Sequence, residues 1–407
     1  MARFRVFSRV LDSERKFLSV FKISWWQKKN CNPVNKMLFF CTKARNFLRG
    51  KIIMAEQNEK QPIKYMSFQW HITDNCDQRC KHCYIFGEDP GITLYSTPFT
   101  KMKEVVDKCI AYTARFNGQP HFAITGGDPL LNPEFWKLAE YLKEKSINFN
   151  MMGNPFHLTQ EICDRLYDCG CTDFQVSIDG LRETHDFLRK PGSFDATWAC
   201  LPLLHKAGIN SGIMATVSHF NINEVPEIID LAVQHRAGIF AFARYVPTGP
   251  EKSNAIKPLE YRAFLDKCYK KFEKYRDEGC WTIFGEKEHL FTLYKYEEGI
   301  VTIPENVKPG ILYDGCHIGL SGCILPDGTL LACRRTAGSE IGNIFNDDFL
   351  DEENMYEKKR LEYRELSKYE DCSRCKLAQW CRGCHAVSRG QFGNFFARDP
   401  QCWHVVE

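Results

Sequence analysis

The stretch "YMSFQWHITDNCDQRCKHCYIF" (65–86) joins a β-strand pattern to a cysteine-rich loop. Its first part is rich in aromatic and β-branched residues, which predicts a strand at 65–73. Cys76, Cys80 and Cys83 follow directly, at spacings of four and three. Three thiolates are one more than a disulfide uses and one fewer than a closed structural zinc site uses. The loop therefore fits a metal cluster that keeps one position open for another ligand.

The chain after this loop alternates between strand patterns and helix patterns. Five further strand patterns, rich in β-branched and aromatic residues, lie at 121–127, 147–154, 173–180, 210–218 and 238–246. Amphipathic helical patterns separate them, at 134–145, 160–169, 196–208 and 224–238. This alternation predicts an α/β fold with a parallel sheet covered by helices, either an open doubly wound sheet or a full or partial barrel. In both folds, chemistry is placed at the carboxyl ends of the strands.

Composition indicates a large folded chain with an unusual beginning. The chain has 407 residues, 44% of them hydrophobic, and it contains 20 cysteines. No apolar run near the start is long enough for a membrane span or a signal core, so we expect a cytoplasmic protein with no transmembrane segment. In a reducing cytosol, clustered cysteines more often serve metal or redox chemistry than disulfides.

Charge is unevenly distributed, with a net +11 in residues 1–53 and −8 in the rest. We assign residues 1–63 to a basic N-terminal extension. One interpretation is an arm that lies on a membrane surface or on nucleic acid. The other is that translation begins at Met54, which we favour because nothing else in the chain extends a basic surface. We therefore expect no nucleic-acid partner.

The pattern C-x3-C-x2-C directly after a first strand resembles the radical S-adenosylmethionine (SAM) superfamily. The resemblance implies a partial (β/α)6 barrel of the TIM type at 64–249. It also implies that Cys76, Cys80 and Cys83 bind a 4Fe-4S cluster whose open iron holds SAM, which is split reductively into methionine and a 5′-deoxyadenosyl radical. The alternatives are three unrelated loop cysteines, or a zinc site completed by His71 or His82.

The segment "TGGDP" (125–129) follows the second predicted strand and resembles the glycine-rich loop of the family. In that resemblance, Gly126 and Gly127 allow the backbone to approach the SAM amino group closely. Asp128 stands where many relatives have glutamate. Taken alone, the segment would be an ordinary turn.

Other strand ends supply further candidates for contacts with SAM. The fourth predicted strand ends in "SIDG", where Ser177 and Asp179 share one face, and similar enzymes contact the ribose or carboxylate of SAM with such a serine. Arg189 offers paired donors for the methionine carboxylate, although it could equally be a surface arginine. Asn154 and Arg244 also follow or end strands and are weaker candidates.

Eight more cysteines follow residue 312, on both sides of a β-hairpin predicted at 324–332. Their order resembles the SPASM extension of radical SAM enzymes, which binds two auxiliary 4Fe-4S clusters. The resemblance implies one cluster held by Cys316, Cys323, Cys333 and Cys384, and an outer one held by Cys372, Cys375, Cys381 and Cys402. Only two residues separate Cys381 from Cys384, where many members have three. Two zinc ribbons are the alternative. We assign 250–312 to a bridging helical region and 313–407 to the SPASM domain.

The resemblance implies an enzyme that modifies a peptide or protein, for example through a thioether or carbon-carbon cross-link in a ribosomal precursor. In sulfatase-maturing members, an aspartate that acts as general base follows the third cysteine of the first auxiliary set. Arg334 stands here, followed by Arg335, and an arginine cannot accept a proton near neutral pH. Sulfatase maturation is therefore the less favoured reaction. The two arginines could attract an acidic leader segment, although a solvated pair is the plainer account.

The expected partners are a peptide or protein substrate, a separate leader-recognition protein and a reductant such as flavodoxin or ferredoxin. Two alternatives stay open. A radical SAM enzyme that acts on a small molecule, such as a tetrapyrrole or cofactor precursor, would share every motif named above. A zinc-ribbon binding protein would share the distal cysteine spacing but would not need the open three-cysteine loop.

Overall fold

The computed structural model describes residues 64–86, 94–247, 256–304, 310, 312–318, 322–345 and 355–404. Contacts divide the chain into two units, Met1–Lys60 and Gln61–Glu407. The basic extension and Met54 lie outside the described residues, so both interpretations of that segment stay predictions. The second unit carries the sheet, the helices and the candidate site.

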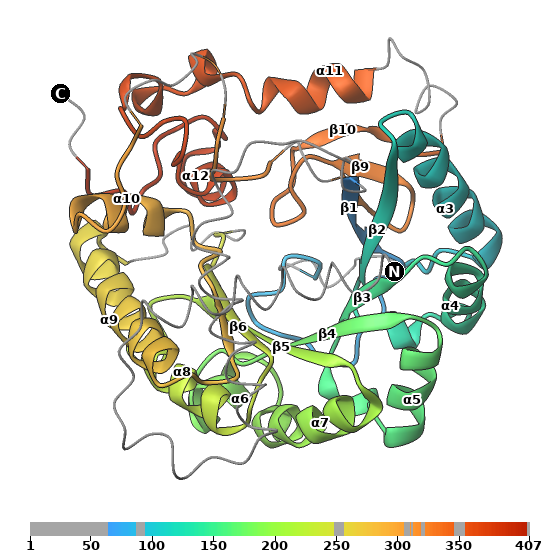
Figure 1. The fold of residues 1–407 in the computed structure, drawn as a ribbon. Helices are drawn as coiled ribbons and strands as arrows, with labels where there is room; N and C mark the ends of the chain where they lie inside the picture. Colours follow the sequence, from blue (N-terminus) through green and yellow to red (C-terminus); the bar gives the residue numbers. More distant parts are fainter. Residues whose placement is uncertain are drawn as a thin grey trace, which may run out of the picture. The chain divides into compact units, whose positions relative to one another are not determined.

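The second unit contains a partial barrel of parallel strands. Six strands pair side by side in sequence order, and all of them are parallel: β1 (Lys64–His71), β2 (Gly118–Thr125), β3 (Phe149–Met152), β4 (Cys171–Ser177), β5 (Asn210–Val217) and β6 (Ile239–Arg244). They coincide with the six predicted strands. Figure 1 shows the strands as a curved row with the helices outside it, which confirms the predicted α/β partial TIM-type barrel.

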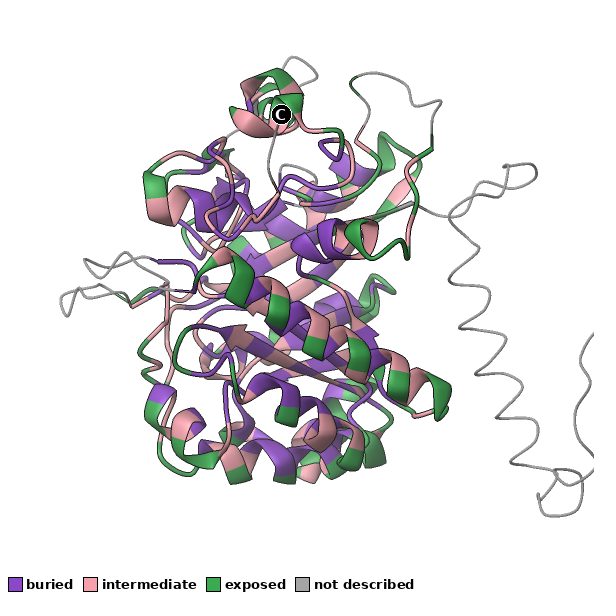
Figure 2. Ribbon diagram, turned by 90° about the vertical axis from the view of Figure 1, so that its left-hand side faces the viewer, coloured by how far each residue is buried: buried purple, intermediate pink, exposed green. Residues whose placement is uncertain are grey.

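The helices of the barrel alternate with its strands along the chain. They are α3 (Phe99–Ala114), α4 (Phe135–Glu144), α5 (Gln160–Asp168), α6 (Arg182–Leu188), α7 (Ser193–Ala207) and α8 (Val225–Gln234), with short 3-10 turns at Pro129–Leu131 and Pro155–His157. In Figure 2, buried and exposed residues alternate along the helices that face the viewer. Sheet residues such as Phe68, Trp70 and Phe122 are fully buried in the same core. The amphipathic period of the sequence therefore sets which face of each helix packs on the sheet.

The sheet continues at both edges beyond the six expected strands. At one edge, β7 (Ile283–Gly285) pairs in parallel with β6. At the other edge, β8 (Gly322–Ile324) pairs in parallel with β1, and β9 (Thr329–Leu331) and β10 (Glu340–Asn343) follow it in antiparallel order. The predicted hairpin is confirmed as β8–β9, but its pairing with β1 was not foreseen. The cysteine-rich region thus extends the sheet of the barrel, and it places Cys323 beside Gln69 of β1.

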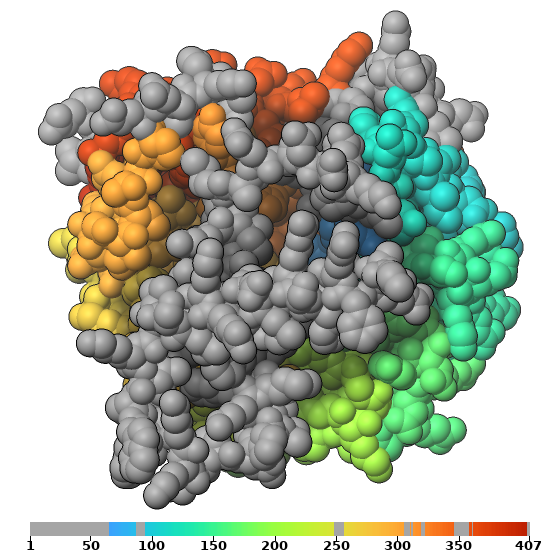
Figure 3. Space-filling view, viewed as in Figure 1, coloured from blue at the N-terminus to red at the C-terminus, as the bar shows by residue number. Residues whose placement is uncertain are grey.

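The bridging region, predicted to be helical, contains one long helix, α9 (Pro258–Asp277), and a shorter one, α10 (Leu290–Glu297). The C-terminal region adds α11 (Met355–Glu362), α12 (His385–Phe392) and 3-10 turns at Leu366–Lys368 and Asp371–Arg374. In Figure 3, α9 and the α3–α4 segment occupy opposite sides of the visible face of this unit. None of the described helices combines the length and the apolar character needed to cross a membrane.

Candidate active site

The three-cysteine loop leaves the carboxyl end of β1 and folds back against the end of α6. Cys76, Cys80 and Cys83 are half-buried. The backbone N–H of Lys81 donates to the carbonyl of Leu188 (2.8 Å), and that of Cys83 donates to the carbonyl of Cys80 (3.0 Å). The described cysteines are all free of disulfides. The loop therefore presents three free thiols from a backbone that is fixed at both ends.

The glycine pair after β2 lies directly on the beginning of the cysteine loop. Gly127 donates its N–H to the carbonyl of Thr73 at 2.7 Å. A Cβ atom on Gly126 would lie 2.2 Å from the carbonyl oxygen of Thr73, and one on Gly127 would lie 2.1 Å from that of Asn75. Gly126 also has a φ of +153°, which side chains rarely adopt. Both glycines are therefore needed to join the two loops, and their contact with SAM stays a prediction.

Asp128 and Asn154 brace the ends of β2 and β3. The buried Asp128 carboxylate accepts hydrogen bonds from the N–H groups of Leu130 (2.9 Å) and Asn154 (3.0 Å). Burial raises the pKa of Asp128. The Asn154 amide donates in turn to Asp77 Oδ1 in the cysteine loop at 2.7 Å. These two predicted SAM contacts are thus brought together, and each has a clear structural role beside the loop.

Asp179 and Arg189 form a buried ion pair against the second cysteine. Arg189 Nε donates to Asp179 Oδ2 at 2.5 Å, and its Nη1 lies 3.7 Å from Cys80 Sγ. His82 Nε2 lies 3.3 Å from the same carboxylate oxygen. Burial disfavours the charged carboxylate, yet Arg189 and His82 hold the pKa of Asp179 well below its usual value. Burial raises the pKa of the Cys80 thiol, and the charge of Arg189 acts in the opposite direction.

Two other predicted SAM contacts have different surroundings. Ser177 is the half-buried last residue of β4, at the carboxyl edge of the sheet. Arg244 ends β6 but is fully buried, and its five N–H donors point to Glu288, Asp399 and Gln401 at 2.6–3.0 Å. Because these contacts use every donor of the guanidinium, Arg244 acts as a structural clasp in this arrangement.

The cysteine loop fits an iron-sulfur cluster by its chemistry. Burial raises the pKa of Cys76 to about 12 and also raises the pKa of Cys80, and a cation that binds a thiol displaces its proton. Within the described ranges, no three His, Cys, Asp or Glu side chains converge as ligands of a single metal ion. A cluster instead takes thiolates spread around a group of several atoms, and this loop supplies three of them next to Arg189.

The distal cysteines lie in two neighbourhoods. Burial, and next the neighbouring Cys384 and Cys333, raise the pKa of Cys316 to about 12. In the same way, burial and the neighbouring Cys402 and Cys375 raise that of Cys372 to about 12. A small cavity is lined by all four cysteines assigned to the outer cluster, Cys372, Cys375, Cys381 and Cys402. Cys323 is buried on β8, near Cys333. The assignment of these residues to two clusters stays a prediction.

Arg334 lies at the end of β1, beside the cysteine loop, although 263 residues separate it from His71. Its Nε atom is 3.1 Å from His71 Nε2, and its guanidinium stacks on the Tyr84 ring at 4.5 Å. Tyr84 directly follows Cys83. Tyr84 was not among the predicted site residues, although its position beside the third cysteine was an available signal.

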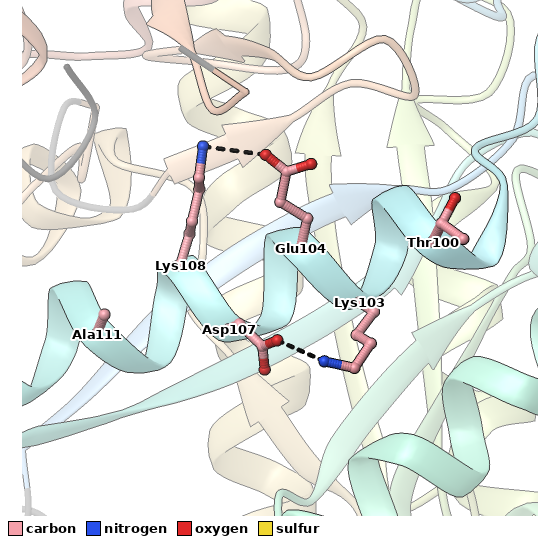
Figure 4. A pocket seen from close by; sticks show the side chains of 6 residues that line it. All are labelled: Thr100, Lys103, Glu104, Asp107, Lys108 and Ala111. Carbon is pink, nitrogen blue, oxygen red and sulfur yellow. Dashed lines mark hydrogen bonds and ion pairs between the residues drawn. The ribbon is translucent and has the colours of Figure 1, made fainter. Parts of the chain in front are cut away.

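A surface hollow on the outside of α3 is separate from this site (Figure 4). It is lined by Thr100, Lys103, Glu104, Asp107, Lys108 and Ala111. Lys103 pairs with Asp107 (2.9 Å) and Lys108 pairs with Glu104 (3.1 Å) along the same helix. Such exposed pairs contribute little to stability, and the hollow has the character of a solvated helix face.

Comparison with known proteins places this geometry in a family. Residues 70–232 match the radical SAM superfamily. The chain is 27% identical over 341 residues to the AdoMet-dependent heme synthase of Methanosarcina barkeri, covering 82% of this chain and 95% of the relative. It is 24% identical over 360 residues to the mycofactocin maturase MftC of Mycolicibacterium smegmatis, covering 86% of this chain and 85% of the relative.

Two solved structures share the fold. The structure of anSMEcpe with bound AdoMet superposes with a TM-score of 0.64 at 18% identity, over 83% of this chain and 94% of that one. SuiB of Streptococcus suis bound to its precursor peptide SuiA gives a TM-score of 0.63 at 18% identity, over 98% and 89%. The family match, with the three-cysteine loop at the mouth of a partial parallel barrel, identifies residues 70–232 as a radical SAM domain.

Proposed function

We propose that this enzyme cleaves SAM reductively at the Cys76–Cys80–Cys83 loop and uses the reaction to modify a peptide or protein side chain. The observation that carries the first part is the loop itself, three free thiols fixed at the carboxyl end of β1. These cysteines would hold a 4Fe-4S cluster, which when bound supplies the electron for SAM cleavage and an open iron for SAM. A flavodoxin or ferredoxin would supply that electron to the enzyme.

The chain's own residues prepare this site in three ways. Gly126 and Gly127 fix the start of the cysteine loop by close backbone contact. Asp179 holds Arg189 against Cys80, which favours the thiolate needed for ligation. Ser177, at the end of β4, remains available at the sheet edge where the family resemblance expects a contact with SAM. We also propose that the eight distal cysteines bind two auxiliary 4Fe-4S clusters.

The peptide substrate is supported by the similarity to MftC, a maturase, over 86% of this chain. Sulfatase maturation is the less favoured reaction, because the residue after Cys333 is Arg334, which cannot act as a general base. A separate leader-recognition protein would complete the system. A thioether or carbon-carbon cross-link is the expected product.

The test separates SAM cleavage from substrate modification. Anaerobically reconstituted enzyme should form 5′-deoxyadenosine under reductant, and Cys76→Ala, Cys80→Ala and Cys83→Ala should each abolish it. Cys280→Ser, at a half-buried cysteine outside both cysteine groups, is the control and should retain cleavage. Cleavage that persists in the loop variants would refute the site. Incubation with the peptide encoded beside the gene, read by mass spectrometry, should show the loss of two hydrogens per event.

A second candidate substrate is a tetrapyrrole precursor. The match to the heme synthase of Methanosarcina barkeri covers 95% of that relative, and a Fe-coproporphyrin III synthase of the same organism is 26% identical over 373 residues. An unchanged peptide mass, together with conversion of an iron porphyrin precursor, would establish this substrate instead.

A further inference from the structure

We propose that Arg334 forms an anion subsite that binds a carboxylate group of the substrate at the mouth of the barrel. This inference deepens the proposed function, on which it rests, by naming the chemical class that the site recognises. The side chain of Arg334 contacts His71 and Tyr84, beside the three-cysteine loop.

Arg334 is held in one orientation by two neutral groups. Its Nε atom is within hydrogen-bond distance of His71 (3.1 Å), the last residue of β1, and its plane lies over the ring of Tyr84. His71 is fully buried, and burial and the arginine lower its pKa well below the usual value, so the ring is neutral and accepts this hydrogen bond. The two partners fix the guanidinium and do not neutralise its positive charge.

The guanidinium nitrogens of the neighbouring arginines already have partners. Arg189 pairs with Asp179, and Arg244 pairs with both Glu288 and Asp399. Arg335 donates to the sulfur of Cys384 (2.6 Å) and to the carbonyl of Arg244 (3.1 Å).

Arg334 differs from these three. In the described part of the chain it has no ion pair, and its Nη1 and Nη2 groups have no hydrogen-bond acceptor. Burial raises the pKa of Asp74, and the charge of Arg334 lowers it, but the two side chains form no ion pair; Asp74 Oδ2 instead accepts a hydrogen bond from the N–H of Tyr95 at 3.3 Å.

A half-buried cation that has no carboxylate in ion-pair contact is unfavourable until an anion binds. The paired N–H groups at the end of the guanidinium match a carboxylate in a two-point contact. The site should therefore select a substrate that carries a carboxylate. An acidic peptide side chain and a porphyrin carboxylate offer the same group.

Binding measurements test the subsite without relying on turnover. The first probe is coproporphyrin III, compared with its tetramethyl ester. The second is the peptide encoded beside the gene, compared with a version whose acidic residues are replaced by amides. Each is titrated into the reconstituted full chain and followed by fluorescence quenching. The variants are Arg334→Gln, which removes the charge, and Arg334→Lys, which keeps it without the planar fork. Arg182→Gln removes an exposed arginine that pairs with Asp195 and is the matched control.

The native enzyme should bind at least one acid probe, and should bind the ester or amide version at least tenfold more weakly. Arg334→Gln should weaken the acid probe about ten- to a hundredfold, Arg334→Lys less, and Arg182→Gln not at all. The probe that responds identifies the source of the carboxylate. Equal affinity in native enzyme and Arg334→Gln, or no binding of either acid probe, overturns the subsite.

SAM cleavage without substrate is measured in the same samples. If the native enzyme does not cleave SAM, the proposed function is refuted. If cleavage is intact but Arg334→Gln binds the acid probe with native affinity, only the subsite is refuted. A thermal midpoint that is lowered in Arg334→Gln but not in Arg334→Lys would show that the glutamine variant is misfolded. The test then uses the lysine variant alone. Native affinity for the acid probe in Arg334→Lys overturns the subsite, and weakened affinity supports it.

Discussion

The guanidinium of Arg244, at the end of β6, donates two parallel hydrogen bonds of 2.6 Å to the carboxylate of Asp399, 155 residues later in the chain. Asp399 also accepts from the backbone N–H of Cys384 at 2.7 Å. A barrel strand is therefore tied, through one buried carboxylate, to the segment that carries the distal cysteines.

Removal of this clasp should destabilise the protein strongly. Arg244→Met leaves Glu288 and Asp399 as buried carboxylates without a cation, which costs about 3–5 kcal/mol. The free energy of unfolding, from urea titration of the full chain, measures the change. Arg262→Met is the control, because Arg262 pairs with Glu297 and Glu298 near the surface and should lose about 1 kcal/mol or less. Similar losses in both variants would contradict the clasp.

The glycine contact with the cysteine loop should be required for cluster binding. In Gly127→Ala, the new Cβ would lie 2.1 Å from the carbonyl oxygen of Asn75, so the loop must move. We expect this variant to lose about four irons per chain after reconstitution, together with SAM cleavage. Gly212→Ala on β5 places its Cβ no closer than 3.6 Å to any neighbour and should keep both. Full iron content in Gly127→Ala would show that the loop tolerates the displacement.

His185 should make stability fall as the pH drops below neutrality. Burial and Arg189 lower its pKa to about 4, and its Nδ1 atom accepts a hydrogen bond from the N–H of Asp179 at 3.0 Å. The unfolded chain takes up a proton near pH 6.5 and the folded chain does not. This contribution to stability is therefore complete above pH 6.5 and is lost as the pH falls toward 4, by about 2 kcal/mol at pH 5.

His185→Asn keeps an acceptor near the same position and cannot be protonated, so it should remove that part of the pH dependence. The measurement is the free energy of unfolding at pH 7 and pH 5. His219→Asn, at an exposed histidine, should keep the native difference between the two pH values. An unchanged difference in His185→Asn would mean that other groups dominate the acid response.

Iron counting tests the two auxiliary clusters. The reconstituted enzyme should contain about twelve irons per chain if it binds three 4Fe-4S clusters. Cys372→Ser combined with Cys402→Ser, at two cysteines of the outer cavity, should lower the content to about eight while 5′-deoxyadenosine formation continues. Cys280→Ser should keep the native content. About four irons in the native enzyme would eliminate the auxiliary clusters altogether.

The local pattern of the sequence was sufficient for the barrel and for the cysteine loop. Each of the six strands, and the helices α4, α5, α7 and α8 between them, is marked by its own period of apolar residues, which depends only on neighbours along the chain. The same holds for Cys76, Cys80 and Cys83, whose ligand set is contained in eight consecutive residues. The β8–β9 hairpin was also visible, because its turn residues are local. The helices α3 and α6 were not predicted.

Only the tertiary structure decided what the arginines do. At the end of a strand, Arg244 has the sequence context of a ligand contact, yet its partners are Glu288 and Asp399. From the sequence, Arg334 and Arg335 were expected to form a solvated pair, but the side chain of Arg334 contacts His71, 263 residues earlier in the chain. The contact between Arg334 and His71 results from the pairing of β8 with β1, which brings the loop after β9 to the mouth of the barrel. A side chain's partner across a sheet edge depends on how distant segments pack, and apolar periodicity carries no information about that packing.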